Sequence, residues 1–158
     1  MSLIIIASVS KNDFIGYQGG VPWYIPEDLK RFRELTLDHP VIMGRRTYES
    51  ILEKQGRPLV RRINIVLSRE KINKRRVLSA ANLEDALYKA NKFGKDVYVI
   101  GGTKVYQEFL PLSDKIELTR VYKNVKGNAL FPKINWSEWK RIFEENHQKF
   151  SFETYERK

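Results

Sequence analysis

The stretch VYVIGGTKVYQEFL, from Val97 to Leu110, contains an apolar run, two glycines and then a helical pattern. The run Val97–Ile100 predicts a buried strand, and Thr103–Leu110 predicts a helix that Pro111 ends. Glycines at a strand-to-helix turn allow a ligand to approach the backbone closely, and a helix N-terminus attracts anions. The spacing fits neither the GxGxxG fingerprint nor a P-loop, so a purely structural tight turn remains an equal alternative.

The same alternation of strands and helices extends over most of the chain. Further apolar runs predict strands at Leu3–Val9, Pro40–Met43, Ile63–Leu67 and Lys115–Tyr122. Helical patterns lie between them at Glu27–Leu37, Arg46–Leu52 and Asn82–Asn91, the last of which begins with Asn82 as its N-cap. Apolar strands separated by helices favour a mostly parallel sheet that is covered on both faces.

The C-terminal segment has a different pattern. Trp139–Asn146 and Lys149–Arg157 predict two strands joined by a short turn, and the second strand alternates between two side-chain faces. This pattern predicts an antiparallel hairpin at the end of the sheet. The expected fold class is therefore α/β with a mixed, mostly parallel sheet, in a single domain that spans residues 1–158.

Composition restricts the class of protein. The chain has 158 residues, of which 42% are hydrophobic, and these values suit one globular domain with a single core. The sequence has no apolar run long enough for a membrane span, and Leu3–Ala7 is too short for a signal peptide. The lack of cysteine excludes disulfides and suits a reducing cytoplasm. The net charge of +10 fits an anionic partner, but the spread of basic residues along the chain favours a solvated surface for most of them.

Three predicted strands end in residues that are suited to phosphate. These ends are Gly-Arg-Arg at residues 44–46, Ser68-Arg69 and Gly101-Gly102. Arginine binds phosphate through paired hydrogen bonds, and the carboxyl ends of parallel strands meet at one edge of a sheet. The three ends together favour a phosphorylated nucleotide over three unrelated surface turns.

The segment GYQGGVPWYIPEDLKRF, from Gly16 to Phe32, places a carboxylate beside large apolar side chains. Pro26 suits the first turn of a helix, where the helix dipole favours the ionised form of Asp28. Trp23 and Phe32 should exclude water and favour the neutral form instead. Such opposed influences are typical of an acid that binds a ligand or transfers a proton. Taken alone, the segment fits a merely helix-stabilising carboxylate somewhat better.

Other kinds of catalytic site have no support in the sequence. His39 and His147 have no metal-ligand or nucleophile partner at a recognisable spacing, no serine lies in a nucleophile elbow, and no acidic cluster has calcium spacing. We therefore expect surface histidines, no metal site and no hydrolytic triad.

Taken as a set, these motifs resemble the dihydrofolate reductase family. The matching segments are IGYQGGVPWYIPEDLKRF, PVIMGRRTYESI, GRPL followed by Arg62 and NIVLS, VIGGTKVYQEFL, the LTR around Thr119, and GNALFP near Pro132. They follow the family's order over nearly the whole chain. The resemblance implies a three-layer fold with an eight-stranded mixed sheet. It also implies NADPH-dependent reduction of 7,8-dihydrofolate to tetrahydrofolate, by hydride transfer to pterin C6 and protonation at N5.

The resemblance assigns a role to each matching position. Asp28 would hold the pterin and promote its protonation, and Trp23 and Thr119 would complete the catalytic group, with Thr119 hydrogen-bonded to Asp28. The implied substrate-binding residues are Ile6, Asp28, Leu29, Phe32, Ile51, Arg57, Leu59, Arg62, Ile100 and Thr119, of which Arg62 would pair with the α-carboxylate of the glutamate tail. The implied cofactor-binding residues are Ala7, Ser8, Ile15, Gly16, Gly19, Gly20, Val21, Gly44, Arg45, Arg46, Thr47, Leu67, Ser68, Arg69, Ile100, Gly101, Gly102, Thr103, Lys104, Val105 and Tyr106. Gly16 to Trp23 would form the loop that closes over the nicotinamide, and Gly101-Gly102 would be a cis peptide bond.

The sequence departs from the family's pattern at four places. Leu52–Gln55 is an insertion, and Val60-Arg61 stands where Pro-Gly is common before the tail-binding arginine, so the pattern assigns Arg62 more directly than Arg57 and adds Arg61 as a further candidate contact. Residues 127–130 read Gly-Asn-Ala-Leu where Gly-Asp-Thr is frequent, and this puts a contact from this turn to the loop at 16–23 in doubt. Val21 replaces the familiar loop methionine and has less reach.

Two alternative functions remain to be distinguished. The reductase of riboflavin biosynthesis shares the GR-x-T and Gly-Gly features but ordinarily lacks PW-x-x-P-x-DL, which is present here. A basic nucleic-acid-binding module would need clustered cations with exposed aromatic residues, whereas the aromatic residues here follow core periodicity. We therefore expect dihydrofolate and NADPH as partners of a cytoplasmic monomer, with no nucleic acid and no membrane.

Overall fold

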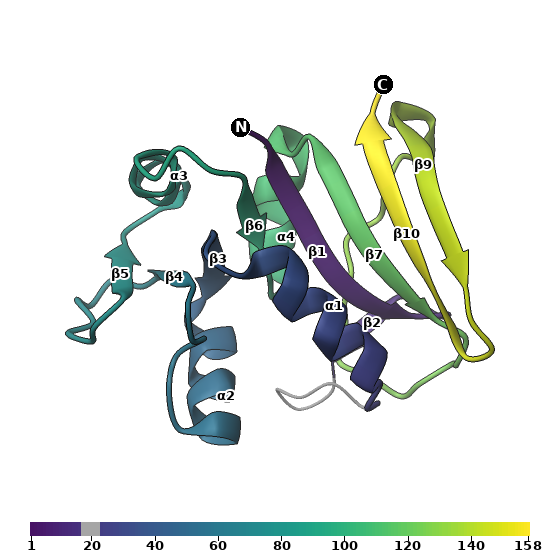
Figure 1. Cartoon of the computed structure of the whole chain (residues 1–158), viewed down its shortest axis with the longest axis horizontal. Coiled ribbons are helices and arrows are strands. Elements are labelled where there is room, and N and C mark those ends of the chain that lie inside the picture. Colours follow the sequence, from purple (N-terminus) through teal and green to yellow (C-terminus); the bar gives the residue numbers. More distant parts are fainter. Residues whose placement is uncertain (17–22) are drawn as a thin grey trace.

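The described part of the chain, residues 1–16 and 23–158 of a computed structural model, is built around an eight-stranded sheet (Figure 1). Its strands, in chain order, are β1 (Leu3–Ser10), β3 (Pro40–Gly44), β4 (Ile63–Leu67), β5 (Val77–Ala80), β6 (Val97–Val99), β7 (Lys115–Val121), β9 (Trp139–Asn146) and β10 (Phe150–Arg157). Their order across the sheet is β5-β4-β3-β6-β1-β7-β10-β9.

The sheet is mixed, as the sequence predicts. In the order across the sheet, all neighbouring strands from β5 to β7 pair in parallel, whereas β10 pairs antiparallel with both β7 and β9. The termini therefore lie near each other, because β1 and β10 flank β7 (Figure 1). The carboxyl ends of the parallel strands lie at one edge of the sheet, which is the usual place for a ligand.

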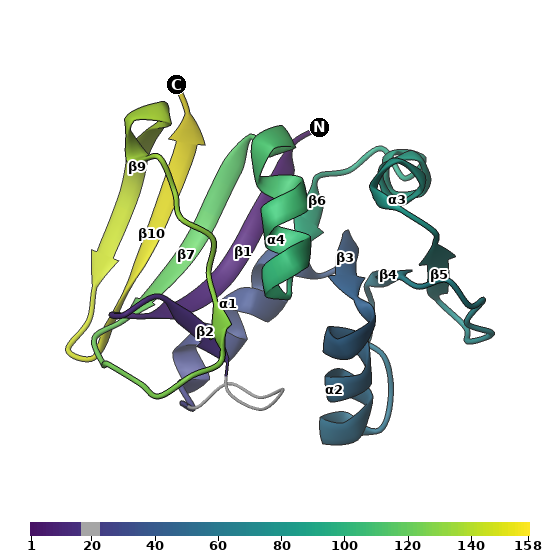
Figure 2. The ribbon, with the colours of Figure 1, turned by 180° about the vertical axis from the view of Figure 1, so that it is seen from behind.

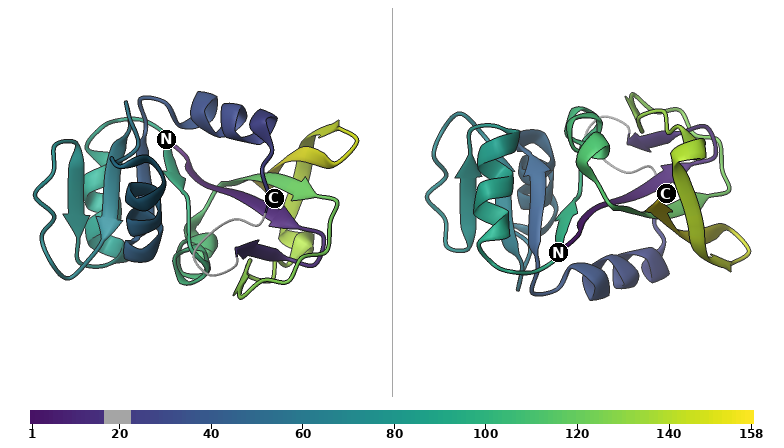
Figure 3. Two further views of the ribbon diagram at one scale, coloured as in Figure 1. Left: turned by 90° about the horizontal axis from the view of Figure 1, so that it is seen from below. Right: turned by 90° about the horizontal axis from the view of Figure 1, so that it is seen from above.

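Helices cover both faces of the sheet. The helices are α1 (Pro26–Thr36), α2 (Arg45–Gln55), α3 (Leu83–Asn91) and α4 (Thr103–Phe109). Side chains of α1 and α2 pack with Ile4, Val41 and Met43, whereas those of α3 and α4 pack with Ile5 and Ile42 on the other face. Figures 2 and 3 show α4 on the side of the sheet opposite α1. Neighbouring residues of β1 and β3 thus face two different cores, because side chains alternate along a strand.

Short elements complete the fold. The strands β2 (Phe14–Gly16) and β8 (Ala129–Leu130) form a separate two-stranded sheet. Two turns of 3₁₀ helix, η1 (Leu110–Leu112) and η2 (Trp136–Glu138), precede β7 and β9. Among the described residues, no helix is long and apolar enough to cross a membrane.

Most predicted elements are present, with shifts of one to three residues at their ends. Helix α1 begins at Pro26, and Asn82 caps α3 by accepting a hydrogen bond from the Asp85 amide. The predicted helix at 46–52 is longer, because the inserted residues 52–55 continue α2 until Gly56 ends it at φ 74°. The cap of α4 is Gly102, so Thr103 is already its first helical residue. The strands β2, β5 and β8 have no counterpart in the sequence-based prediction.

Candidate active site

A cleft of about 1480 Å³ lies at the carboxyl ends of the parallel strands. Its walls come from α1 and α2 on one side and from the Gly101-Gly102 turn and α4 on the other. Residues of β1 and β7 form the part between them. Two of the three phosphate-suited strand ends, at residues 44–46 and 101–102, therefore meet the segment around Asp28 in one cavity, although they are far apart in the sequence.

Asp28 is the central acid of this cleft. Its Oδ1 accepts a hydrogen bond of 2.6 Å from the Thr119 hydroxyl on β7. The Trp23 indole nitrogen donates to the Ser8 hydroxyl on β1 at 3.0 Å. The Ser8 hydroxyl also favours the ionised form of Asp28, so Trp23 is linked to the acid through Ser8. Strands β1 and β7 thus hold a carboxylate that belongs to α1.

Burial raises the pKa of the Asp28 carboxyl above its ordinary value of 3.8. Hydrogen bonds from Thr119 and Ser8 and the positive charge of Arg31 act in the opposite direction. The sequence predicts opposed influences on the Asp28 carboxyl, and the structure shows such influences. Desolvation by burial has the largest effect on its pKa. A carboxyl of this kind can hold a polar group of a ligand and take part in proton transfer.

Tyr106 on α4 lines the cleft between the half around Asp28 and the half around Gly101-Gly102, since its ring packs against Gly101 and its phenol is influenced by the charge of Asp28. Its hydroxyl donates to the Ile6 carbonyl at 2.7 Å, and the ring packs edge-on against Phe131. Burial strongly raises the pKa of this phenol, so it stays neutral. Tyr106 is thereby fixed as an apolar wall with a satisfied hydroxyl.

The other half of the cleft has donors suited to phosphate. Gly44 is the N-cap of α2, and Arg45 and Arg46 follow it, so two cations stand at a helix N-terminus. Arg45 donates to the Ser68 hydroxyl at 2.8 Å, which connects the ends of β3 and β4. The residue types and their placement fit a phosphorylated nucleotide.

Two observations test whether NADPH fits this half. Within the described chain the buried Thr103 hydroxyl has no hydrogen-bond partner, and it lies at the start of α4 in the cleft lining. Gly101 has a φ of +121°, and a Cβ there would lie 3.3 Å from the Tyr106 ring. A cis peptide bond joins Gly101 to Gly102. A free hydroxyl donor beside a bare backbone turn fits a cofactor with a pyrophosphate.

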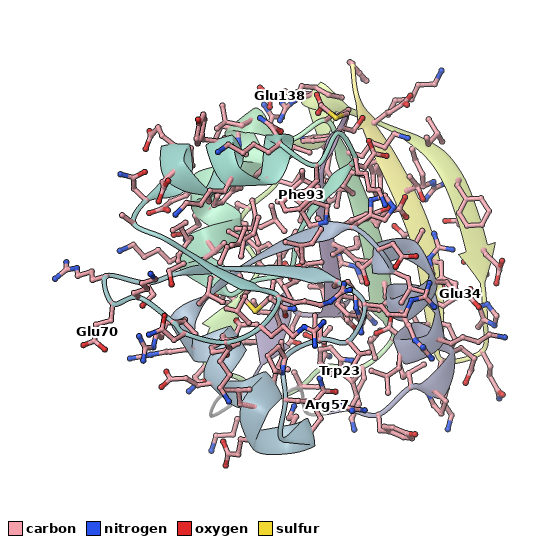
Figure 4. The ribbon with its side chains drawn as sticks, turned by 60° about the vertical axis from the view of Figure 1, so that its left-hand side comes forward. Trp23, Glu34, Arg57, Glu70, Phe93 and Glu138 are labelled. Atoms are coloured by element: carbon pink, nitrogen blue, oxygen red, sulfur yellow. The ribbon has the colours of Figure 1, made fainter. Side chains whose placement is uncertain are left out.

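The predicted tail-binding arginines differ from each other. Arg62 is 6% exposed, donates to the Val60 carbonyl at 2.8 Å and to the Thr36 hydroxyl at 3.3 Å, and burial lowers the pKa of its guanidinium. No ion pair in the described part of the chain includes Arg62, so this buried cation suits an anionic ligand. Arg57 is exposed beside the C-terminal end of α2 (Figure 4). Arg61, the possible extra contact, instead pairs with Asp38 at 2.8 Å.

The cleft brings most of the predicted site residues together. Those in its lining are Ile6, Ala7, Ser8, Ile15, Asp28, Leu29, Phe32, Gly44, Arg45, Arg46, Thr47, Ile51, Leu59, Leu67, Ile100, Gly101, Gly102, Thr103, Lys104, Val105, Tyr106 and Thr119. Those outside the lining are Gly16, Trp23, Arg57, Arg62, Ser68 and Arg69. Gly19, Gly20 and Val21 lie outside the described residues.

Both histidines are half-buried rather than fully exposed. The Nδ1 of His39 lies 2.8 Å from the Asp96 carbonyl, and its ring packs edge-on against Tyr98. His147 stacks on Phe150 in the turn between β9 and β10. Both rings have structural contacts, and neither lines the cleft.

The lining also contains residues that the sequence reasoning did not assign to the site. They are Arg31, Leu35, Ser50, Lys54, Ala81, Asn82, Leu83, Glu84, Gln107, Glu108, Glu117, Asn128, Ala129 and Leu130. Helical spacing could have identified some of them, since Leu35 lies on the same face of α1 as Asp28 and Phe32. Glu117 needs the pairing of β7 with β1, which the sequence does not specify.

Comparison with known proteins gives one consistent result. A family model described as Dihydrofolate reductase matches residues 2–157. The chain is 37% identical over 156 residues to a dihydrofolate reductase of Buchnera aphidicola subsp. Acyrthosiphon pisum, with 98% of this chain and 94% of that protein covered. It is 39% identical over 145 residues to one of Haemophilus influenzae, with coverage of 92% and 88%.

A solved structure has the same fold. The dihydrofolate reductase of Enterococcus faecalis, solved in complex with NADP(H) and RAB-propyl, superposes with a TM-score of 0.88 at 30% identity. The match covers 99% of this chain and 96% of that one. The expected three-layer arrangement with an eight-stranded mixed sheet and a C-terminal hairpin is confirmed.

Proposed function

The chain belongs to the dihydrofolate reductase family, and from this premise we propose that it reduces 7,8-dihydrofolate to 5,6,7,8-tetrahydrofolate with NADPH. When bound, NADPH supplies the hydride, which adds to pterin C6 while N5 takes up a proton. The single observation that carries the proposal is the position of Asp28, a buried acid that is hydrogen-bonded to Thr119 in a cleft with phosphate-suited strand ends.

Asp28 has two tasks in this proposal. Its ionised carboxylate accepts hydrogen bonds from pterin N3 and the 2-amino group, and this orients the ring in the cleft. The same carboxylate favours the addition of a proton at N5, because a negative charge near the ring stabilises the cationic form of the pterin. The hydrogen bond from Thr119 to Oδ1 fixes the side-chain rotamer of Asp28. The position of the second carboxylate oxygen is thereby fixed as well.

The opposite half of the cleft holds the cofactor. Arg45, Arg46 and Thr47 at the start of α2 would bind its phosphates, including the 2′-phosphate that distinguishes NADPH from NADH. The free Thr103 hydroxyl would donate to the pyrophosphate beside Gly101-Gly102. These residues bind and orient, and the apolar walls at Ile100 exclude water from the reacting atoms.

Arg62 and Arg57 would bind the glutamate tail of the substrate. The buried guanidinium of Arg62 pairs with no acid among the described residues and can form paired hydrogen bonds with a carboxylate, so Arg62 is the stronger anchor. Arg57 is exposed and would add a longer-range attraction to the same anion.

A spectrophotometric assay tests this function. The purified protein should consume NADPH when dihydrofolate is added and should be nearly inactive when either compound is omitted. NADH at the same concentration should support much slower turnover, because it lacks the phosphate that Arg45 and Arg46 would bind. NADPH consumption that does not depend on dihydrofolate would contradict the proposal.

We further propose that the protein acts as a single-domain cytoplasmic monomer that does not bind nucleic acid. Its basic residues are spread over the chain, and the absence of cysteine suits a reducing compartment. Size-exclusion chromatography with light scattering should give the mass of one chain, 18.7 kDa. A gel-shift titration should detect no salt-sensitive complex with DNA or RNA.

A further inference from the structure

An ion pair lies in the cleft near Asp28 and has no role in the function proposed above. Nη2 of Arg31 on α1 donates to Oε2 of Glu117 on β7 at 2.9 Å. The Thr154 hydroxyl on β10 donates to the same oxygen at 2.8 Å. The side chains of Arg31 and Glu117 are 26% and 13% exposed, so this pair is largely removed from water.

Aromatic rings hold the guanidinium of Arg31 from its other side. Its Cζ lies 4.8 Å from the ring centre of Phe152 on β10 and 5.4 Å from that of Phe143 on β9. Cations over aromatic faces are attracted by the ring quadrupole, and guanidinium groups stack well there. Three strands therefore fix the position of this charge.

The pair runs parallel to the contact that holds Asp28. Arg31 follows Asp28 by three positions on α1, which places both on one helix face. Glu117 precedes Thr119 by two positions on β7, which places both on one strand face. The contacts Asp28–Thr119 and Arg31–Glu117 are thus neighbouring links between the same helix and the same strand, and all four residues line the cleft.

We infer that Arg31 is a positioning residue, which keeps a fixed positive charge beside Asp28 so that this acid stays ionised while it holds the substrate. The inference rests on the proposed function, and it assigns Arg31 no contact with substrate or cofactor. Glu117, Thr154 and Phe152 act one step further away, because they hold the guanidinium in place.

Among the described groups around Asp28, Arg31 is the cation that lowers the pKa of this acid. Thr119 from β7 and Ser8 from β1 contribute neutral hydroxyls. Tyr106 from α4 has a phenol that stays neutral, because burial strongly raises its pKa. Burial raises the pKa of Tyr98 on β6, which faces Glu117 and Arg31, to about 12, so it too is neutral. The charge of Arg31 therefore partly offsets the effect of burial on the pKa of Asp28.

Three substitutions separate this role from a purely structural one. Arg31→Met removes the charge and keeps much of the side-chain length. Glu117→Gln keeps an oxygen acceptor for Arg31 and Thr154 but removes the opposing negative charge. Lys30→Met is the matched control, because it removes a positive charge from the adjacent position of α1, where Lys30 is exposed and lies 3.9 Å from Glu34. Thermal melting checks that each variant folds.

The measurement is a carbon-13 NMR titration of the Asp28 carboxyl in the ligand-free protein, with Asp28→Asn as the assignment control. Arg31→Met should raise the pKa of Asp28 by about 0.5 to 1 unit. Glu117→Gln should lower it, and Lys30→Met should leave it unchanged. The pH dependence of turnover should move in the same directions.

Opposite shifts for Arg31→Met and Glu117→Gln would support the inference, because loss of packing alone does not change sign with charge. An unchanged titration in Arg31→Met, or a shift in the same direction in both variants, would overturn it. If Arg31→Met does not fold, a downward shift in Glu117→Gln still supports the inference, and an unchanged or upward shift rejects it. The titration needs no ligand or turnover, so its result is independent of whether the proposed reaction occurs.

Discussion

Thr119→Val tests how strongly one hydrogen bond controls the acid of the cleft. Thr119 is 5% exposed, and its hydroxyl donates to Asp28 Oδ1 at 2.6 Å, a short bond between a neutral donor and a carboxylate. Valine has nearly the same shape, so the change removes the hydroxyl donor and leaves the packing of β7 largely intact. The carboxylate then retains the Ser8 hydroxyl and the charge of Arg31 as stabilising groups.

A hydrogen bond to a charged group contributes about 1.5–3 kcal/mol, which corresponds to a factor of about ten to a hundred in an equilibrium constant. At neutral pH we therefore expect the affinity for dihydrofolate to fall by at most this factor, since the bond exists before the substrate binds, while the affinity for NADPH stays the same. The pKa of Asp28 should rise, because one of the groups that stabilise its ionised form is lost. The profile of turnover against pH should accordingly move to higher pH.

Steady-state kinetics over a range of pH, together with fluorescence titration of NADPH, measure these changes. Ser151→Ala is the control, since it removes another buried hydroxyl that donates to a carboxylate, Glu153, at 2.6 Å outside the cleft. A Thr119→Val enzyme with unchanged dihydrofolate affinity and an unchanged pH profile would refute the role given to this bond. Equal losses of dihydrofolate and NADPH affinity would refute it too, since they would indicate a general distortion.

Three further predictions concern stability and the substrate tail. Because burial raises the pKa of Asp28 above 3.8, the folded protein binds this proton more tightly than the unfolded chain, and stability falls as pH rises through that interval. Asp28→Asn should therefore raise the melting temperature at neutral pH, and this gain should disappear below about pH 3.8. A gain that persists below this pH would contradict the raised pKa of Asp28. Arg62→Met should raise the KM for dihydrofolate about ten- to a hundredfold and leave the KM for a pteridine without a glutamate tail unchanged. The control Arg61→Met breaks an exposed ion pair with Asp38 and should change neither KM. Phe109→Ala should lower the free energy of unfolding by about 3–5 kcal/mol in urea titrations, since Phe109 is fully buried between α4 and the sheet; a loss below about 1 kcal/mol would show that its packing was misjudged.

The general architecture can be predicted from the sequence because its signals are local. The apolar run at Val97 and the two glycines after it predict the end of β6 and the start of α4 within a residue. The same logic places the end of β3 at Gly44 on the common carboxyl edge. The strands that the sequence-based prediction missed are short: β2 has three residues, β8 has two, and the four residues of β5 follow a run of charged residues. Such short strands depend on their pairing partners more than on their own composition.

The extra turn of α2 illustrates a different limit. The insertion at 52–55 interrupts the family's pattern, so comparison with that pattern identifies the insertion but does not predict its secondary structure. Its residues are good helix formers, and they extend α2 until Gly56 closes it. As a result Lys54 reaches the cleft lining, which the motif alone does not indicate.

The surroundings of Asp28 could be predicted only in part. Its place in the first turn of α1 and its apolar neighbours can be read from the segment itself. The helical spacing puts Arg31 on the same face as Asp28, but the sequence does not show which groups its charge contacts. Its partners Glu117 and Phe152 lie more than 80 residues further along the chain, and only the pairing of β7 with β10 brings them together. Trp23 was expected in the catalytic group, and its contact with Asp28 is an indirect one, through Ser8.

The most direct test of the central claim compares wild-type protein with Asp28→Asn in two assays, NADPH binding and dihydrofolate-dependent NADPH oxidation at neutral pH. Asparagine keeps the shape of the side chain and an oxygen that can accept from Thr119, but it has no charge. The account predicts that the variant binds NADPH as the wild type does and loses most of its turnover. Near-normal turnover in Asp28→Asn would contradict the claim that this carboxylate holds the pterin and promotes its protonation.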